Sequence, residues 1–359
     1  MAGKDKPHSI IKRENSKSNP MSKRKKLTLI GIAMLGMVIM AFGNTISYWL
    51  EQASGQLNIL YSSVPINEAL NSSNLSEIQK ANLELLPSIL HFAKNDLGLK
   101  GYDNYQKVFI EPTETTLWSL SASESFSLAP YKWYYPVIGE AGYRGFFNEK
   151  RGLKERNELR AQGWDASLGR VSAWSTLGWF NDPILSNNLL LAHGEFARLI
   201  IHELTHVTVF IPGDDVFNEN LATYVGNQGA LLFIKKEFGE DSGEYKNLVD
   251  RLEDIDHFEV LMQGFSFFLD SMYTSVSTLS IEEKLSHKNR AFSKIASRLR
   301  EEKFNDSLRV SSLADSAITW DNTDFTDFLQ YHSQQDSIHD VCNTKFGGSI
   351  KKMMTSPTE

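Results

Sequence analysis

Three residues in the middle of the chain have the types and the spacing of a metal-binding helix: His202, Glu203 and His206 form an HExxH pattern. On an α-helix, residues four apart differ by about 40° around the axis, so both imidazoles can reach one metal ion. The glutamate between them faces the side on which a bound water lies and can act as its general base. The spacing therefore predicts a zinc hydrolase site that holds one ion.

A third ligand is needed, because catalytic zinc takes three protein ligands and keeps one position open for water. Glu219 follows the second histidine by thirteen residues and stands at the start of a second helical pattern. A turn at residues 212–213, Pro-Gly, predicts that this helix returns antiparallel beside the first and brings Glu219 to the histidines. We expect Glu219 to complete the zinc shell. Asp214 or Asp215 is the alternative, although both suit helix caps.

Other side chains could support this site. Arg198 lies one turn before the first histidine, and Thr223 lies one turn after Glu219. Both could contact the metal ligands, without binding the metal, and so orient them. A tetrahedral oxyanion needs a further donor, and the residues eligible by chemistry are Tyr143, Arg144, Tyr224, His257 and Tyr331. We also expect Tyr143 and Arg144 to contact the substrate.

The segment SAWSTLGWFNDP (172–183) combines large aromatic residues with small polar ones. One interpretation is a buried strand that runs into an aromatic turn. The other is an edge strand beside the metal that pairs with an extended peptide through its main chain, with Trp174, Ser175 and Thr176 at the substrate.

Helical patterns dominate the rest of the chain, with few strand patterns. Apolar spacing, caps and Pro/Gly signals predict helices at 71–99, 148–162, from about 193 or 195 to 211, 216–238, 244–279, 281–308 and 323–342. Ser73 or Asn74 is the expected cap of the first. Strand patterns occur at 106–110, 115–119 and 170–174. We expect an α+β, mostly α fold: a zincin-like metallopeptidase domain with a small sheet before the metal helix, preceded by one transmembrane helix.

The N-terminal region differs in composition from the remainder. Residues 1–26 carry nine Lys or Arg against two acids and predict a disordered, basic cytoplasmic tail. Residues 27–50 are uncharged and long enough for a transmembrane signal anchor. The alternative is a cleaved signal peptide and a secreted or periplasmic protein. Residues 51–359 are expected to form the metallopeptidase domain, with its metal core at 165–240 and a helical C-terminal part at 244–345, on the outer side of the membrane.

Charge and cysteine content exclude several classes of protein. The net charge is −7. Because residues 1–26 are basic, the remainder of the chain has a more negative net charge, and a phosphate backbone would repel it. We therefore expect no nucleic-acid partner. Cys342 is the only cysteine, so the chain forms no internal disulfide and has no CxxC metal knuckle.

Longer stretches around the site resemble a known family. ARLIIHELTH (197–206) followed by FNENLATYVG (217–226) is similar to the putative aminopeptidase family of bacterial zinc proteins, whose HExxH and NExxA motifs place it among the gluzincin metallopeptidases. The resemblance extends to GYRGFF (142–147), the 172–183 segment and FLQYH (328–332). It implies that His202, His206 and Glu219 bind zinc and that Glu203 is the catalytic base.

Together these features predict a membrane-anchored zinc peptidase that acts on peptides or proteins. The resemblance to the family implies that it is an aminopeptidase. An exopeptidase must recognise a free amino terminus, and Glu140, Asp214 and Asp215 are the candidate acids. The alternatives are a zinc endopeptidase and a catalytically inactive binding or scaffold protein that keeps the fold.

Overall fold

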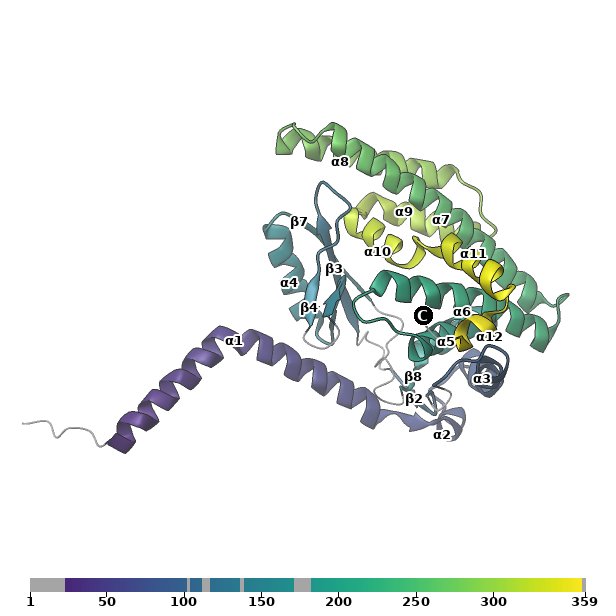
Figure 1. Ribbon diagram of the computed structural model, residues 1–359, viewed down its shortest axis with the longest axis horizontal. Coiled ribbons are helices and arrows are strands. Elements are labelled where there is room, and N and C mark those ends of the chain that lie inside the picture. Colours follow the sequence, from purple (N-terminus) through teal and green to yellow (C-terminus); the bar gives the residue numbers. More distant parts are fainter. Residues whose placement is uncertain (1–22, 102–103, 112–116, 136–138, 171–181, 357–359) are drawn as a thin grey trace, which may run out of the picture. The chain divides into compact units, whose positions relative to one another are not determined.

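The computed structural model describes residues 23–101, 104–111, 117–135, 139–170 and 182–356 (Figure 1). The chain divides into two compact units, Met1–Ala53 and Ser54–Glu359. The second unit is mostly helical and carries small sheets, and it contains the HExxH pattern. The predicted strand at 170–174 and the peptide-binding segment at 172–183 fall largely on 171–181, outside the described residues.

The prediction of a transmembrane helix at 27–50 is wrong. Within the part of the chain that the structure describes, no helix is both long and apolar enough to cross a membrane. Residues 27–50 belong to α1 (Lys23–Ser62), a single helix of 40 residues. The helix continues from the uncharged stretch into the polar residues after Leu50.

The described strands form three small sheets, all of which include strands that precede the HExxH helix. The largest has the order β6 (Tyr143–Phe146), β3 (Trp118–Glu124), β7 (Trp164–Arg170), and both pairings are antiparallel. A second has the order β1 (Val64–Pro65), β2 (Lys107–Phe109), β8 (Ile184–Leu185), with β2 and β8 parallel. β4 (Trp133–Tyr135) pairs with β5 (Gly139–Ala141). The expected strand at 106–110 contains β2, and the one at 115–119 overlaps the start of β3, which continues to Glu124.

Further helices precede the HExxH helix in the sequence. After the short α2 (Ile66–Leu70), α3 (Glu77–Asn95) begins at Ser76, whose backbone N–H donates to Gln79 in a capping box. The expected caps at Ser73 and Asn74 were wrong by two to three residues, since the helix starts only where this reciprocal pair forms. α4 (Glu149–Ala161) packs on β3 and β7. Its bounds agree with those of the expected helix at 148–162.

The main core forms around two adjacent helices, α5 (His193–Thr208) and α6 (Asp215–Phe238), which lie side by side in Figure 1. Apolar residues of α5 recur at spacings of three and four, which gives one buried face: Phe196, Ala197, Ile200, Ile201 and Leu204. Leu221, Val225 and Phe233 of α6 join the same core. The turn from residue 209 to 214 is short, so the two helices are antiparallel, as the sequence predicted.

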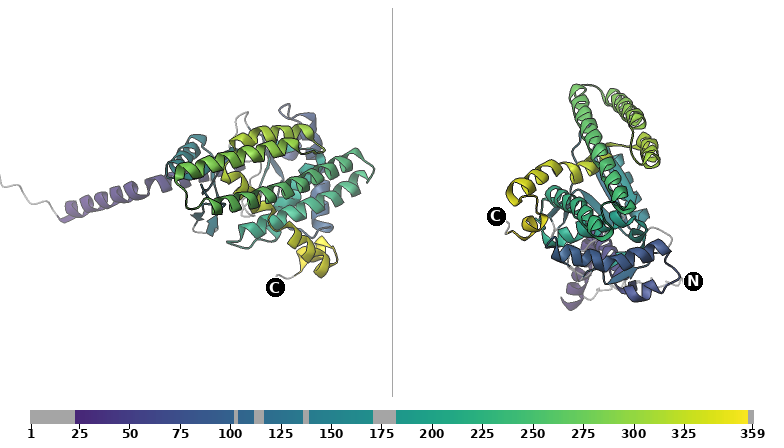
Figure 2. Two further views of the ribbon diagram at one scale, coloured as in Figure 1. Left: turned by 90° about the horizontal axis from the view of Figure 1, so that it is seen from above. Right: turned by 90° about the vertical axis from the view of Figure 1, so that its right-hand side faces the viewer.

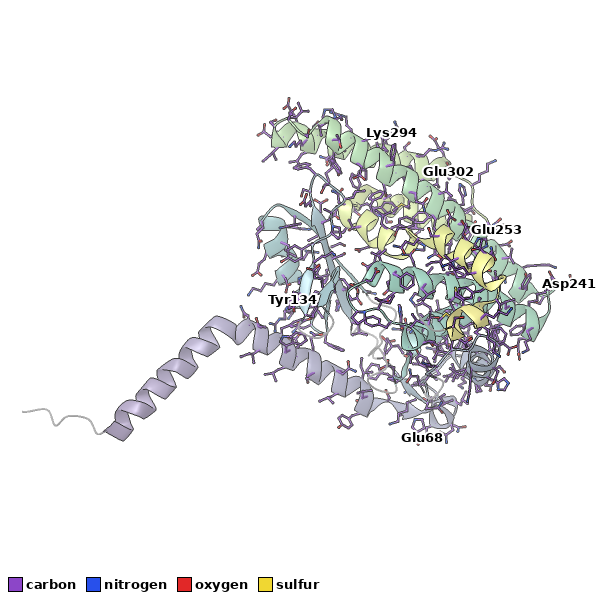
Figure 3. All side chains as sticks on the ribbon, in the orientation of Figure 1. Glu68, Tyr134, Asp241, Glu253, Lys294 and Glu302 are labelled. Carbon is purple, nitrogen blue, oxygen red and sulfur yellow. The ribbon has the colours of Figure 1, made fainter. Side chains whose placement is uncertain are left out.

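The C-terminal half adds a second core. It consists of α7 (Gly243–Ser275), α8 (Ile281–Glu301), α9 (Ser307–Ser316), a 3-10 turn at Ala317–Thr319 and α10 (Asn322–His332). α7 and α8 run alongside each other (Figure 2), and Asp241 lies in the turn that joins α6 to α7 (Figure 3).

One predicted helix in this half is two. The pattern at 323–342 is divided between α10 and α11 (Gln335–Phe346), and α12 (Ile350–Thr355) follows. The chain breaks at Ser333 and Gln334, where the Gln334 N–H donates to the side chain of Asn220 in α6 instead of continuing a helix.

Candidate metal centre

The antiparallel packing of α5 and α6 brings His202, His206 and Glu219 together. The two histidines lie one turn apart on α5, and Glu219 lies near the start of α6. Within the described residues these three side chains form a group whose ligand atoms could hold one metal ion. The arrangement is the one expected from the helix, turn and helix pattern of the sequence.

The ligand atoms have the separations of a tetrahedral shell. The Nε2 atoms of the histidines lie 3.1 Å apart. Oε2 of Glu219 lies 3.4 Å from Nε2 of His202 and 3.5 Å from Nε2 of His206. Zinc with bonds of about 2.0–2.1 Å in tetrahedral geometry holds its ligand atoms about 3.3–3.4 Å apart. Two nitrogens and one oxygen converge on one point at that spacing, so the residues fit a zinc ion.

The electrostatics of the cluster favour a positive charge at this point. Burial alone would lower the pKa of His206, but its hydrogen bond to Glu219 and the charges of Glu219 and Glu203 raise it. Burial alone would raise the pKa of Glu219, but hydrogen bonds with His202 and His206 lower it to about 2. Because both shifts favour the charged forms, a cation is stabilised by the same carboxylates.

Glu203 lies in the same α5 turn and differs from Glu219 in its surroundings. Burial raises the pKa of Glu203, the histidines oppose this, and the charges of Glu219 and Asp182 add to it. A carboxylate with a raised pKa is a better proton acceptor near neutral pH. Of the two half-buried glutamates, Glu203 is therefore suited to act as a base and Glu219 to bind a cation.

Tyr143 and Arg144 face opposite sides of β6, because successive side chains alternate along a strand. Tyr143 is 43% exposed, and its pKa is raised by burial of the hydroxyl and then by the charges of Glu219, Asp215 and Glu203. Arg144 instead forms an ion pair with Glu155 of α4, at 2.9 Å. The ion pair with Glu155 places Arg144 in the packing of α4 on the sheet.

The remaining predicted residues are found in different places. Arg198 donates to Asn227 of α6, at 3.5 Å, and Thr223 is buried one turn after Glu219. Trp174, Ser175 and Thr176 lie outside the described residues.

The three acids considered for binding a free amino terminus have different surroundings in the structure. Asp214 caps α6 by accepting from the Phe217 N–H, at 3.1 Å. Glu140 pairs with Lys132 at the surface, at 3.4 Å. Burial, and then the charge of Glu219, raises the pKa of Asp215, which Lys132 opposes. The charge of Glu219 therefore acts on Asp215.

Sequence reasoning missed several side chains near the site. Tyr105 is buried and has a φ of 62°, a left-handed conformation that is unusual for a residue other than glycine. Its N–H donates to the carbonyl oxygen of Asp182, at 2.8 Å, and its pKa is raised by burial and then by the charges of Glu203 and Asp182. The turn at Gly101, beside the C-terminal part of α5, was the available signal. Two buried asparagines, Asn218 and Asn220, were also missed.

Comparison with known proteins assigns the chain to a family. Residues 47–354 match the family model described as putative aminopeptidase, a range that includes α5, α6 and the helices after them. No curated protein and no solved structure gives a significant match.

Proposed function

Because the chain belongs to the putative aminopeptidase family, we propose that it is a zinc-dependent peptidase that removes residues from the amino terminus of peptides. Family membership supports a peptidase in general. The zinc dependence rests on one observation, the convergence of the His202, His206 and Glu219 ligand atoms at distances of 3.1–3.5 Å.

The residues of the cluster have distinct tasks in this proposal. Zinc would be held by His202, His206 and Glu219. When bound, it would lower the pKa of the attacking water and polarise the scissile carbonyl. Glu203 accepts the proton of the attacking water and transfers it to the leaving amine. Its half-buried position between the two histidines supports this task, since the proton stays on a side chain shielded from bulk solvent.

Tyr143 supplies a hydrogen-bond donor in the same scheme. Burial and three nearby carboxylates raise the pKa of its hydroxyl, so the phenol keeps its proton throughout the neutral range. A neutral phenol can donate to the oxygen that becomes negative as the carbonyl is attacked. The Tyr143 side chain is 43% exposed, so a substrate can reach it.

The preference for a free amino terminus rests on Asp215. An ammonium group needs an acceptor close to the metal, and Asp215 is the half-buried acid whose pKa responds to Glu219. A charge-assisted hydrogen bond of this kind is worth about 1.5–3 kcal/mol, enough to favour a free over a blocked amino terminus.

A peptide panel tests this function. Purified full-length protein, loaded with zinc, is assayed on matched peptides that differ only in a free or an acetylated amino terminus. We expect hydrolysis of the free peptides from the amino end, loss of activity with a chelator and recovery with added zinc. Cleavage of the acetylated peptides at internal bonds would instead identify an endopeptidase. No hydrolysis of either set by zinc-loaded protein would contradict a peptidase.

A further inference from the structure

The ligand Glu219 is flanked in the sequence by two asparagines that the structure buries almost completely. Asn218 is 3% and Asn220 0% exposed. Successive helical residues turn by about 100°, so the two amides leave α6 on different sides while Glu219 points to α5. Asparagine is a weak helix former because its amide competes for backbone groups. Two of them in the first two turns of α6 therefore need an explanation beyond helix stability.

Asn218 fixes the turn between the two ligand helices. Its Oδ1 accepts from the Ile211 N–H and its Nδ2 donates to the Ile211 carbonyl oxygen, both at 2.8 Å. The side chain thus satisfies both backbone groups of a residue that connects α5 to α6. This sets the distance between the end of the histidine helix and the start of the glutamate helix.

Asn220 fixes the other side of α6 to the C-terminal helices. Its Nδ2 donates to the carbonyl oxygens of Val216, at 2.8 Å, and Gln330, at 2.9 Å. Its Oδ1 accepts from the Gln334 N–H, at 2.8 Å, and from Nε2 of Gln335, at 3.1 Å. All the hydrogen-bonding capacity of a fully buried amide is used at the break between α10 and α11.

A helix start is the part of a helix that opens most readily, because its first N–H groups lack partners within the helix. Glu219 lies only five residues into α6, so its carboxylate would move with any such opening. The two amides hold this start from opposite sides, to the α5–α6 turn and to the α10–α11 junction.

We infer that Asn218 and Asn220 are positioning residues for the zinc ligand Glu219, and that the α10–α11 junction is thereby part of the metal centre although it contributes no ligand. This inference rests on the proposed zinc site. It predicts that each amide sets zinc affinity and ligand geometry, beyond any effect on folding.

Asparagine-to-aspartate variants provide a test, because they keep the size of the side chain and replace the donating Nδ2 by an acceptor. The variants are Asn218→Asp and Asn220→Asp. The matched control is Asn82→Asp, since Asn82 is equally buried and its Nδ2 donates to two carbonyl oxygens, of Leu189 at 3.0 Å and Leu191 at 2.8 Å. Zinc affinity is measured by chelator competition, ligand geometry by the visible spectrum of the cobalt(II)-substituted protein, and folding by the melting temperature.

We expect zinc affinity to fall by about 10- to 100-fold in both variants, as for other residues that orient ligands, with a changed cobalt spectrum. Asn82→Asp should lower the melting temperature and leave the affinity and the spectrum as in the wild type. Folded variants that match Asn82→Asp in both metal readouts would overturn the inference. Wild-type protein that binds no zinc would instead contradict the proposed function.

A milder variant serves if the aspartate variants do not fold. Gln335→Ala removes the hydrogen bonds that the Gln335 side chain donates to Asn220, and it leaves both asparagines and the Gln334 N–H in place. We expect a several-fold loss of zinc affinity and a cobalt spectrum shifted in the same direction. Unchanged affinity and spectrum in folded Gln335→Ala would count against the inference.

Discussion

Gly226 of α6 lies against His202 of α5: a Cβ on the glycine would stand 3.2 Å from the His202 Cβ and 3.0 Å from the Arg198 carbonyl oxygen. The second contact is with backbone, which cannot rotate away. The close approach of the two helices therefore depends on the missing side chain at this position, and this approach brings Glu219 within reach of both histidines.

Gly226→Ala should force α5 and α6 apart by a few tenths of an ångström and weaken the zinc shell. We expect zinc affinity to fall about tenfold or more. Gly229→Ala is the control, because a Cβ there would mainly meet side-chain atoms of Leu97 and Ile201. Chelator competition on both variants measures the effect, and equal affinities would show that the close approach is irrelevant to the metal site.

Asp215→Asn should raise KM for peptides with a free amino terminus by about 10- to 100-fold, because a charge-assisted hydrogen bond is lost. Asp214→Asn is a suitable control, since asparagine also caps a helix start and Asp214 serves as the cap of α6. Steady-state kinetics on both variants decides the matter. An unchanged KM in Asp215→Asn would remove Asp215 from amino-terminus recognition.

Asp324 gives a prediction about pH. Burial raises its pKa to about 7, although hydrogen bonds from the Asp321 and Asp324 N–H groups lower it. The folded state thus holds a proton that the unfolded chain releases at about pH 4. The resulting stabilisation is full below about pH 4 and is lost as the pH rises through about 7.

We expect the difference in melting temperature between the wild type and Asp324→Asn to depend on pH. Because asparagine does not titrate, this difference should shift in favour of the wild type as the pH falls from about 8 to about 5. Thermal unfolding across this range measures it. A difference that is independent of pH would mean that Asp324 has an ordinary pKa in the folded state.

Lys288 and Asp165 form a buried ion pair between α8 and β7. Lys288 also donates to the Ser125 carbonyl oxygen, at 2.9 Å. Lys288→Met leaves the Asp165 carboxylate without its cation, and we expect a loss of about 3–5 kcal/mol in the free energy of unfolding. Lys294→Met, on an exposed residue of the same helix (Figure 3), should change it little. Urea unfolding compares the two, and similar losses would contradict a special role of the pair.

The sequence was sufficient for the local part of the site. Helical spacing and a Pro-Gly turn predicted α5, α6 and the meeting of His202, His206 and Glu219, because residues close in sequence determine a helix pair. It could not predict Asn220, whose partner Gln330 lies 110 residues away, since such a contact depends on how distant elements pack. The break between α10 and α11 was missed for the same reason.

The transmembrane prediction failed for a different reason. An uncharged run of sequence has the length of a membrane span, but length and lack of charge alone do not establish one. The structure continues the run in α1 to Ser62, and no helix within the described residues has the length and apolar character to cross a membrane.

The central claim is that a zinc ion on His202, His206 and Glu219 works with Glu203 as the base. The most direct measurement compares zinc content and peptide hydrolysis of the wild type and Glu203→Gln. We expect about one zinc per chain in both proteins, since Glu203 is not a ligand, and a loss of kcat of about 10²- to 10⁴-fold in Glu203→Gln. Wild-type protein without stoichiometric zinc, or Glu203→Gln that hydrolyses peptides at the wild-type rate, would contradict the claim.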